Sequence, residues 1–111
     1  MTVKAIIGTS KAISFPISRN NTAVVPADLS QLKIDFYVQN VLKLTYLLNN
    51  SETGFEIVYE NNKFNVYLEA SKTENLPIGL MEYKIWIKWP DARFQDDFVL
   101  AKKGVLLEWT K

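Results

Sequence analysis

Few residues of this chain could carry out chemistry. The sequence contains neither histidine nor cysteine, which excludes both a histidine-activated nucleophile and a metal site built from thiolates. Asp96 and Asp97 are adjacent, and neighbours in a strand point to opposite faces, so this pair cannot act as acid and base on one bond. No glycine-rich loop can cradle a phosphate, because the glycines are isolated at Gly8, Gly54, Gly79 and Gly104. The sequence therefore predicts a protein that is not an enzyme and takes no cofactor.

A calcium site is the remaining metal hypothesis. Asp91, Asp96 and Asp97 supply hard oxygen ligands near one turn. Their spacing matches no known calcium-binding loop, and a solvated loop that closes a hairpin explains them better. We therefore predict no metal site.

Trp86 is the aromatic residue that fits least well as a core residue. It is out of phase with the apolar residues of its segment and stands between Lys84 and Lys88. A large aromatic side chain on a polar face can anchor a protein interface or stack on a sugar. The simpler interpretation is a partly buried second sheet face, or cross-strand packing with Tyr59 or Tyr67. We predict that Trp86 is an interface residue, and glycan binding is the alternative.

Two further segments are candidates for contact with other subunits. Trp109, near the C-terminus, could dock on a neighbour or make a satellite core contact. A small sheet protein also has open edges that can accept a strand from another chain. Pro16 would protect one edge, because proline cannot donate to a ladder. Nothing in the sequence protects the strand that contains Phe98, Val99 and Leu100.

The length and the net charge of the chain indicate which classes of partner can be excluded. The chain has 111 residues, which is room for one domain, 1–111. Its 13 basic and 12 acidic residues give a net charge of +1, whereas a nucleic-acid reader concentrates lysine and arginine. No stretch is long enough to span a bilayer, and Ala5-Ile6-Ile7 is too short for a signal peptide. We expect no nucleic-acid or membrane partner, and synthesis in the cytoplasm.

The dominant pattern has a period of two, which is typical of half-buried strands. It predicts strands within 13–17, 32–38, 41–47, 55–59, 64–68 and 81–89. The segment 81–89 is predicted to be the longest strand, with Trp89 on its apolar face. Two closing strands are predicted at 94–102 and 105–109, with a bulge or tight corner at Gly104.

Asparagines, prolines and glycines predict the connections. Asn20-Asn21 predicts a turn and Asn61-Asn62 a hairpin, because asparagine tolerates positive φ. Segments 26–30, 49–54 and 90–93 are predicted corners, loops or turns. One short helical turn is predicted near 71–76, because Ser71 and Glu74 are spaced as a capping box and Pro77 and Gly79 follow.

Seven or eight short strands at intervals of about ten residues predict an all-β fold, a two-sheet immunoglobulin-like antiparallel β-sandwich. A small closed barrel is the alternative, because periodicity does not show which strands pair.

From Ile13 onward, the order of features resembles the N-terminal domain of phage baseplate upper proteins, which belongs to the small immunoglobulin-like domains of phage tails. The resemblance rests on the corner Asp28-Leu29-Ser30-Gln31-Leu32, the segment from Leu68 to Gly79, the aromatic strand 83–87 and the closing Gly104-Val105-Leu106-Leu107. Gln31 stands where a small residue is more usual.

This resemblance implies a non-enzymatic virion structural protein that is assembled in the host cytoplasm. Its partners would be other virion structural proteins, and it would form a homo-oligomer. Baseplate upper proteins usually continue into a longer C-terminal region, whereas this chain ends after one domain. A head fibre, a capsid decoration and a tail adaptor therefore stay open beside the baseplate.

Overall fold

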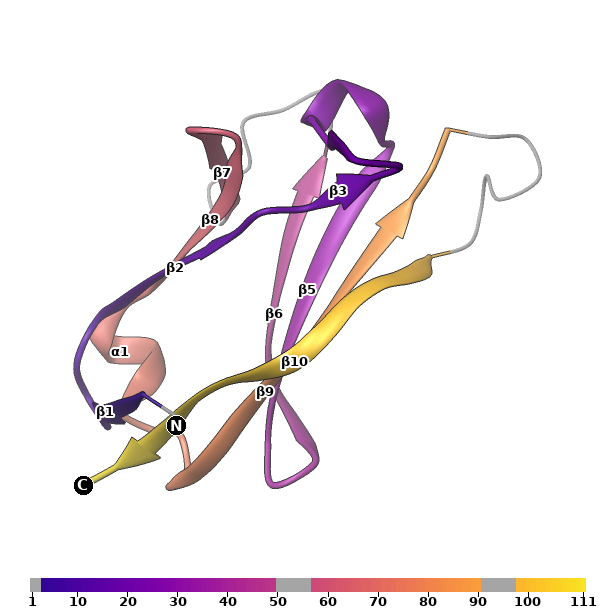
Figure 1. Cartoon of the computed structure of the whole chain (residues 1–111). Helices are drawn as coiled ribbons and strands as arrows, with labels where there is room; N and C mark the ends of the chain where they lie inside the picture. Colours follow the sequence, from indigo (N-terminus) through magenta and orange to yellow (C-terminus); the bar gives the residue numbers. More distant parts are fainter. Residues whose placement is uncertain (1–2, 50–56, 91–97) are drawn as a thin grey trace.

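The computed structural model of this chain describes residues 3–49, 57–90 and 98–111 (Figure 1). Of these residues, 64% lie in strands and 7% in helical turns, which confirms the predicted all-β class. The strands are β1 (Lys4–Ile6), β2 (Lys11–Phe15), β3 (Ser18–Arg19), β4 (Thr22–Ala23), β5 (Gln31–Val38), β6 (Val41–Asn49), β7 (Ile57–Glu60), β8 (Lys63–Leu68), β9 (Gly79–Lys88) and β10 (Val99–Thr110).

The strands form two larger sheets and one small hairpin. The five-stranded sheet has the order β1-β10-β9-β5-β6, and the three-stranded sheet has the order β2-β8-β7. All the paired strands are antiparallel except β1, which runs parallel to the end of β10. β3 and β4 form the hairpin. In Figure 1, β2, β7 and β8 make one layer and the long strands β5, β6, β9 and β10 make the other.

One hydrophobic core lies between the two layers. The alternation predicted for β5 is present, because Leu32, Ile34 and Phe36 are fully buried. Phe15 of β2 joins the layers, with its ring centroid 4.8 Å from that of Tyr83 on β9. Each such fully buried large side chain stabilises the fold by about 1.5–3 kcal/mol.

Residues with positive φ make the tight turns, as the asparagines predicted. Asn61 and Asn62 have φ values of 55° and 62° and join β7 to β8, which confirms that hairpin. Asn20 and Asn21 act in the same way between β3 and β4. Positive φ at both central residues gives a turn whose twist matches that of its strands.

The helical turn lies one residue earlier than predicted, and its capping is different. α1 spans Ala70–Thr73, its N-cap is Glu69, and no side chain caps it. Ser71 is inside the helix, so the predicted capping box is wrong. The segment predicted only as a turn-rich corner contains a second helical turn, η1 (Pro26–Asp28). The three-residue spacing of Ser71 and Glu74 alone did not show whether Ser71 caps the helix or lies inside it.

The C-terminal segment is one strand and not two. β10 has 12 residues and is the longest strand, ahead of β9 with 10. Its register shifts lie between Leu100 and Lys102 and between Val105 and Leu107, so the bulges are at Ala101 and Leu106, not at Gly104. Gly104 stays within the ladder, where a Cβ would lie 3.1 Å from the hydroxyl of Tyr83.

Candidate interaction surface

The outer face of the five-stranded sheet carries three rows of side chains. Residues that are paired in a ladder project to the same face, and the register across β6, β5, β9 and β10 therefore fixes each row. The first row is Leu47, Lys33, Trp86 and Leu100. The second row is Thr45, Asp35, Lys84 and Lys103. The third row is Leu42, Tyr37, Glu82 and Val105.

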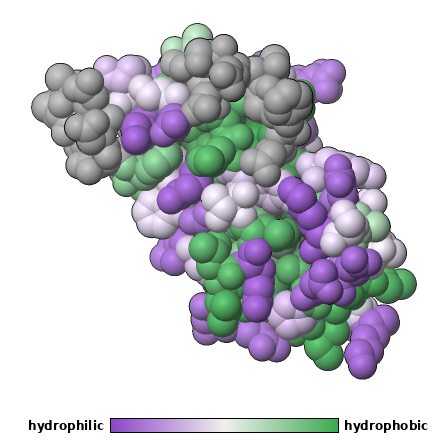
Figure 2. All heavy atoms as spheres, turned by 180° about the vertical axis from the view of Figure 1, so that it is seen from behind, coloured by the Kyte–Doolittle hydropathy of each residue, from purple (hydrophilic) through white to green (hydrophobic). Residues whose placement is uncertain are grey.

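Apolar residues of the first and third rows are exposed to solvent. Leu42 and Leu47 are 50% and 46% exposed, and Leu100 and Val105 are 40% and 54% exposed. Seen from behind, the molecule shows hydrophobic groups in patches that are separated by hydrophilic residues (Figure 2). The apolar side chains at both ends of the first and third rows lie on either side of a mainly charged second row, and such a mixture of apolar and polar groups is usual in protein interfaces.

Lysines lie over Trp86 of the first row and over Phe98. The Lys33 amino group lies 4.7 Å from the ring centroid of Phe98 and 5.7 Å from that of Trp86. The Lys88 amino group lies 4.8 Å from the Phe98 ring. Trp86 is half-buried, and its indole N–H is buried without an acceptor among the described residues. Such an unpaired buried donor costs free energy in the single chain.

The second row is held by a buried carboxylate. Asp35 is 6% exposed and accepts a hydrogen bond of 2.8 Å from the hydroxyl of Thr45. Burial raises the pKa of the Tyr37 phenol, and the negative charge of Asp35 and a hydrogen bond to it raise the pKa further. The Lys84 amino group lies 4.9 Å from the Tyr37 ring. These contacts fix the side chains at the centre of the face.

The structure brings together three of the five predicted interface residues. Trp86 and Leu100 are directly paired across β9 and β10, and Phe98 is linked to Trp86 through Lys33. Val99 is paired with Ile87 and, like Leu100, lines a cleft beside the β3–β4 hairpin. Packing of Trp86 with Tyr59 or Tyr67 through a ladder is wrong, because those residues belong to the other sheet.

Trp109 is a core residue and not an available docking anchor. Its side chain is 1% exposed, and its indole N–H donates to the sulfur of Met81. The predicted contact with a neighbouring subunit is therefore corrected to a core contact. The parallel pairing with β1, a strand that the sequence did not predict, brings Trp109 opposite Ala5.

The edge at Phe98, Val99 and Leu100 is open, but the strand has features that protect it. Among the described strands, β1 pairs with β10 only from Glu108 onward, so the earlier part of β10 has no neighbour on that side. Bulges at Ala101 and Leu106 interrupt the strand, and Lys102 and Lys103 lie between them. Bulges and lysines are common devices that prevent edge-to-edge pairing. They begin after Leu100, so the subunit contact at Phe98, Val99 and Leu100 stays a prediction. Pro16 follows β2, which is an edge strand as predicted.

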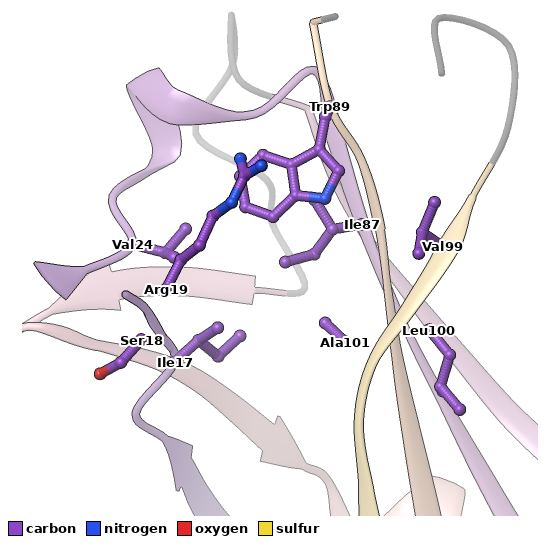
Figure 3. Close-up of a pocket in the computed structure, with 9 residues that line it drawn as sticks. All are labelled: Ile17, Ser18, Arg19, Val24, Ile87, Trp89, Val99, Leu100 and Ala101. Atoms are coloured by element: carbon purple, nitrogen blue, oxygen red, sulfur yellow. The ribbon is translucent and has the colours of Figure 1, made fainter. Parts of the chain in front are cut away.

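A cleft of about 200 Å³ lies between the β3–β4 hairpin and the ends of β9 and β10. In Figure 3, the Arg19 side chain lies over Trp89 at one end, and Ile17 and Ala101 line the two sides of the gap. The Arg19 guanidinium is 4.4 Å from the Trp89 ring centroid. Trp89 is therefore half-buried against the core and not fully inside it. The cleft is smaller than the roughly 300–1,000 Å³ usual for ligand pockets.

The acidic residues considered for calcium, Asp91, Asp96 and Asp97, lie outside the described residues. Within the described ranges, no three acidic side chains gather into a group that could hold a metal ion. The described part of the chain also contains no helix that is long and apolar enough to cross a membrane.

Comparison with known proteins adds no family to this description. No protein-family model matches the chain, and no curated protein sequence matches it significantly.

Proposed function

We propose that this chain is an immunoglobulin-like β-sandwich that acts as a non-enzymatic assembly module, through contacts with other proteins. The strand order supports the fold assignment. When β2, β5, β6, β7, β8, β9 and β10 are given the immunoglobulin letters B, C, C′, D, E, F and G, strands B, E and D share one sheet and strands C′, C, F and G share the other. This division is that of immunoglobulin domains with a C′ strand.

The observation that carries the functional proposal is the outer face of the five-stranded sheet. It presents exposed Leu47, Leu100, Leu42 and Val105 beside the half-buried Trp86. Exposed aliphatic side chains beside a large aromatic one are typical of a surface that contacts another protein.

The biological setting that we propose is a bacteriophage virion, as a tail, baseplate, head-fibre or capsid accessory protein. This part of the proposal rests on the resemblance to baseplate upper proteins in the corner at Asp28, the segment that ends in Pro77 and Gly79, and the closing strand after Gly104.

Carbohydrate binding through Trp86 has less support. A sugar platform needs an accessible ring face, whereas Trp86 is half-buried and has the Lys33 amino group over it. A glycan array with the wild type and with Trp86→Ala tests this alternative, which predicts a glycan signal that the substitution abolishes.

The proposed setting is tested on particles released from the producing cells and purified by density-gradient centrifugation. Quantitative mass spectrometry is expected to find the chain in intact particles at a fixed copy number per particle. Immunogold labelling would then place it on the tail or on the head. Absence of the chain from purified particles, while it is abundant in the lysate, would overturn the virion assignment.

A further inference from the structure

We propose that two copies of this chain pack face to face through the outer face of the five-stranded sheet, about a two-fold axis that runs parallel to the strands between β5 and β9. This inference rests on the proposed function in protein assembly and names the partner, a second copy. The argument uses the three rows defined above.

Rotation by 180° about this axis places each row of one copy over the same row of the second copy, with the order of the strands reversed. β5 of one copy then lies over β9 of the second copy, and β6 lies over β10. In the second row, Lys84 of the second copy lies over Asp35, whose buried carboxylate places a negative charge beneath it near the axis. Two such contacts form, one on each side of the axis, because a two-fold interface repeats every contact.

The first and third rows are complementary under the same rotation. Leu47 of one copy meets Leu100 of the second copy, and Leu42 meets Val105. These four side chains are 40–54% exposed in the single chain, and their burial supplies the hydrophobic contribution.

The polar residues of these rows also find suitable partners. Lys33, which lies over Phe98 and Trp86 of its own chain, meets Trp86 of the second copy, so a lysine faces an aromatic residue and not another cation. Tyr37, whose phenol donates to Asp35 of its own chain, meets Glu82 of the second copy, so no like charges are opposed there.

The other symmetric face-to-face arrangement is disfavoured by charge. A two-fold axis perpendicular to the strands, through the second row, would place each residue of that row over its own copy. Lys84 would meet Lys84 and Lys103 would meet Lys103. Like charges held together are destabilising, so the charge pattern selects the axis parallel to the strands.

The size of the face sets the expected strength. At about 4.8 Å between strands and about 3.3 Å per residue, the four facing strands cover roughly 500 Å² over eight residues. A standard interface buries about 800 Å² per partner, and smaller ones are transient. We therefore expect a reversible dimer with a dissociation constant in the micromolar range.

The first experiment measures mass against concentration by size-exclusion chromatography with light scattering, on the full chain. The mass is expected to rise from 12.8 kDa towards twice that value between micromolar and near-millimolar concentrations. Leu100→Glu is expected to raise the dissociation constant at least tenfold. Val58→Glu is the matched control, because Val58 is 51% exposed on the other sheet, and it should leave the constant unchanged.

The second experiment tests the geometry by complementation. Leu47→Glu and Leu100→Lys should each be monomeric alone, and their mixture should form a heterodimer. In the mixture, one contact pairs the introduced carboxylate with the introduced amine, and the other keeps leucine against leucine. Circular dichroism verifies that each variant is folded.

Cross-linking gives a readout that does not depend on those charges. Because the chain has no cysteine, Leu47→Cys and Leu100→Cys provide unique thiols. A short thiol cross-linker should join the two variants efficiently in a mixture and join Leu47→Cys to Val58→Cys poorly.

The dimer proposal is overturned by a monomeric wild type at all concentrations. It is equally overturned by a dimer that Leu100→Glu leaves intact, or by equal cross-linking of the two mixtures. These results leave the virion assignment standing if the chain is found in purified particles. Conversely, absence from particles would remove that assignment without affecting a measured dimer.

Discussion

The indole N–H of Trp109 donates a hydrogen bond of 3.0 Å to the Sδ atom of Met81, and both side chains are buried. The contact joins the end of β10 to the beginning of β9. It gives the indole donor a partner inside the core, where an unpaired donor would be costly.

Truncation of Trp109 is therefore expected to be far more damaging than truncation of Trp86. Trp109→Ala should lower the free energy of unfolding by about 3–5 kcal/mol, because it leaves a large cavity. Trp86→Ala, at a half-buried position on the outer face, should cost about half as much or less. Urea unfolding at low protein concentration measures both values, and equal losses would contradict the core assignment of Trp109.

The hydroxyl of Thr73 is expected to stabilise the contact between α1 and the turn after β1. The side chain is fully buried, and its Oγ1 donates to the carbonyl of Thr9 at 2.8 Å. Thr73→Val keeps the shape but leaves that carbonyl without its donor, and should cost about 1–3 kcal/mol. Thr73→Ser keeps the hydroxyl and should cost only about 1 kcal/mol, for the lost methyl group. Thermal or urea unfolding compares the two, and the reverse order would disprove the role of the hydrogen bond.

In the turn between β7 and β8, substitution of Asn62 by alanine should destabilise the fold more than substitution by glycine. Asn62 has a φ of 62°, a conformation that costs most residues with a Cβ about 1–2 kcal/mol and that asparagine tolerates better, because its side chain can hydrogen-bond locally. Asn62→Ala should therefore destabilise the fold by about 1 kcal/mol, whereas Asn62→Gly should be close to neutral. The difference between the two midpoints of urea unfolding is the measurement, and identical midpoints would refute the requirement for positive φ.

Tyr37 should make the fold less stable at high pH. Burial first, and then the charge and hydrogen bond of Asp35, raise its pKa in the folded state above the usual 10.0. The unfolded chain loses the phenol proton at lower pH than the folded chain, so the free energy of unfolding falls as the pH rises above about 10. The contribution is fully present below pH 10 and is lost as the pH passes through the folded pKa.

Tyr37→Phe should remove this component of the pH dependence. Ultraviolet difference titration should also lose one late-ionising phenol. A variant with the same titration curve and the same alkaline decline in stability as the wild type would contradict the proposed coupling to Asp35.

Local patterns in the sequence were sufficient for the class of fold and for much of its detail. Alternation at Ile13 and Phe15 and along 32–38 predicted buried faces that the structure confirms. The asparagine pairs predicted tight turns, because tolerance of a positive φ is a property of the asparagine side chain and does not depend on distant contacts. The parallel strand β1, the continuity of β10 and the bulges at Ala101 and Leu106 were not predicted. They depend on pairing between residues far apart in the chain.

For the candidate interaction surface too, some features could be predicted from the sequence and others could not. The phase of Trp86 within its own strand is a local property, so the sequence alone was enough to place it apart from the core. Its neighbours Lys33 and Leu100, the buried carboxylate of Asp35 and the inward position of Trp109 were decided only by the tertiary structure. The physical reason is that register and burial are set by long-range strand pairing, which a period of two cannot specify.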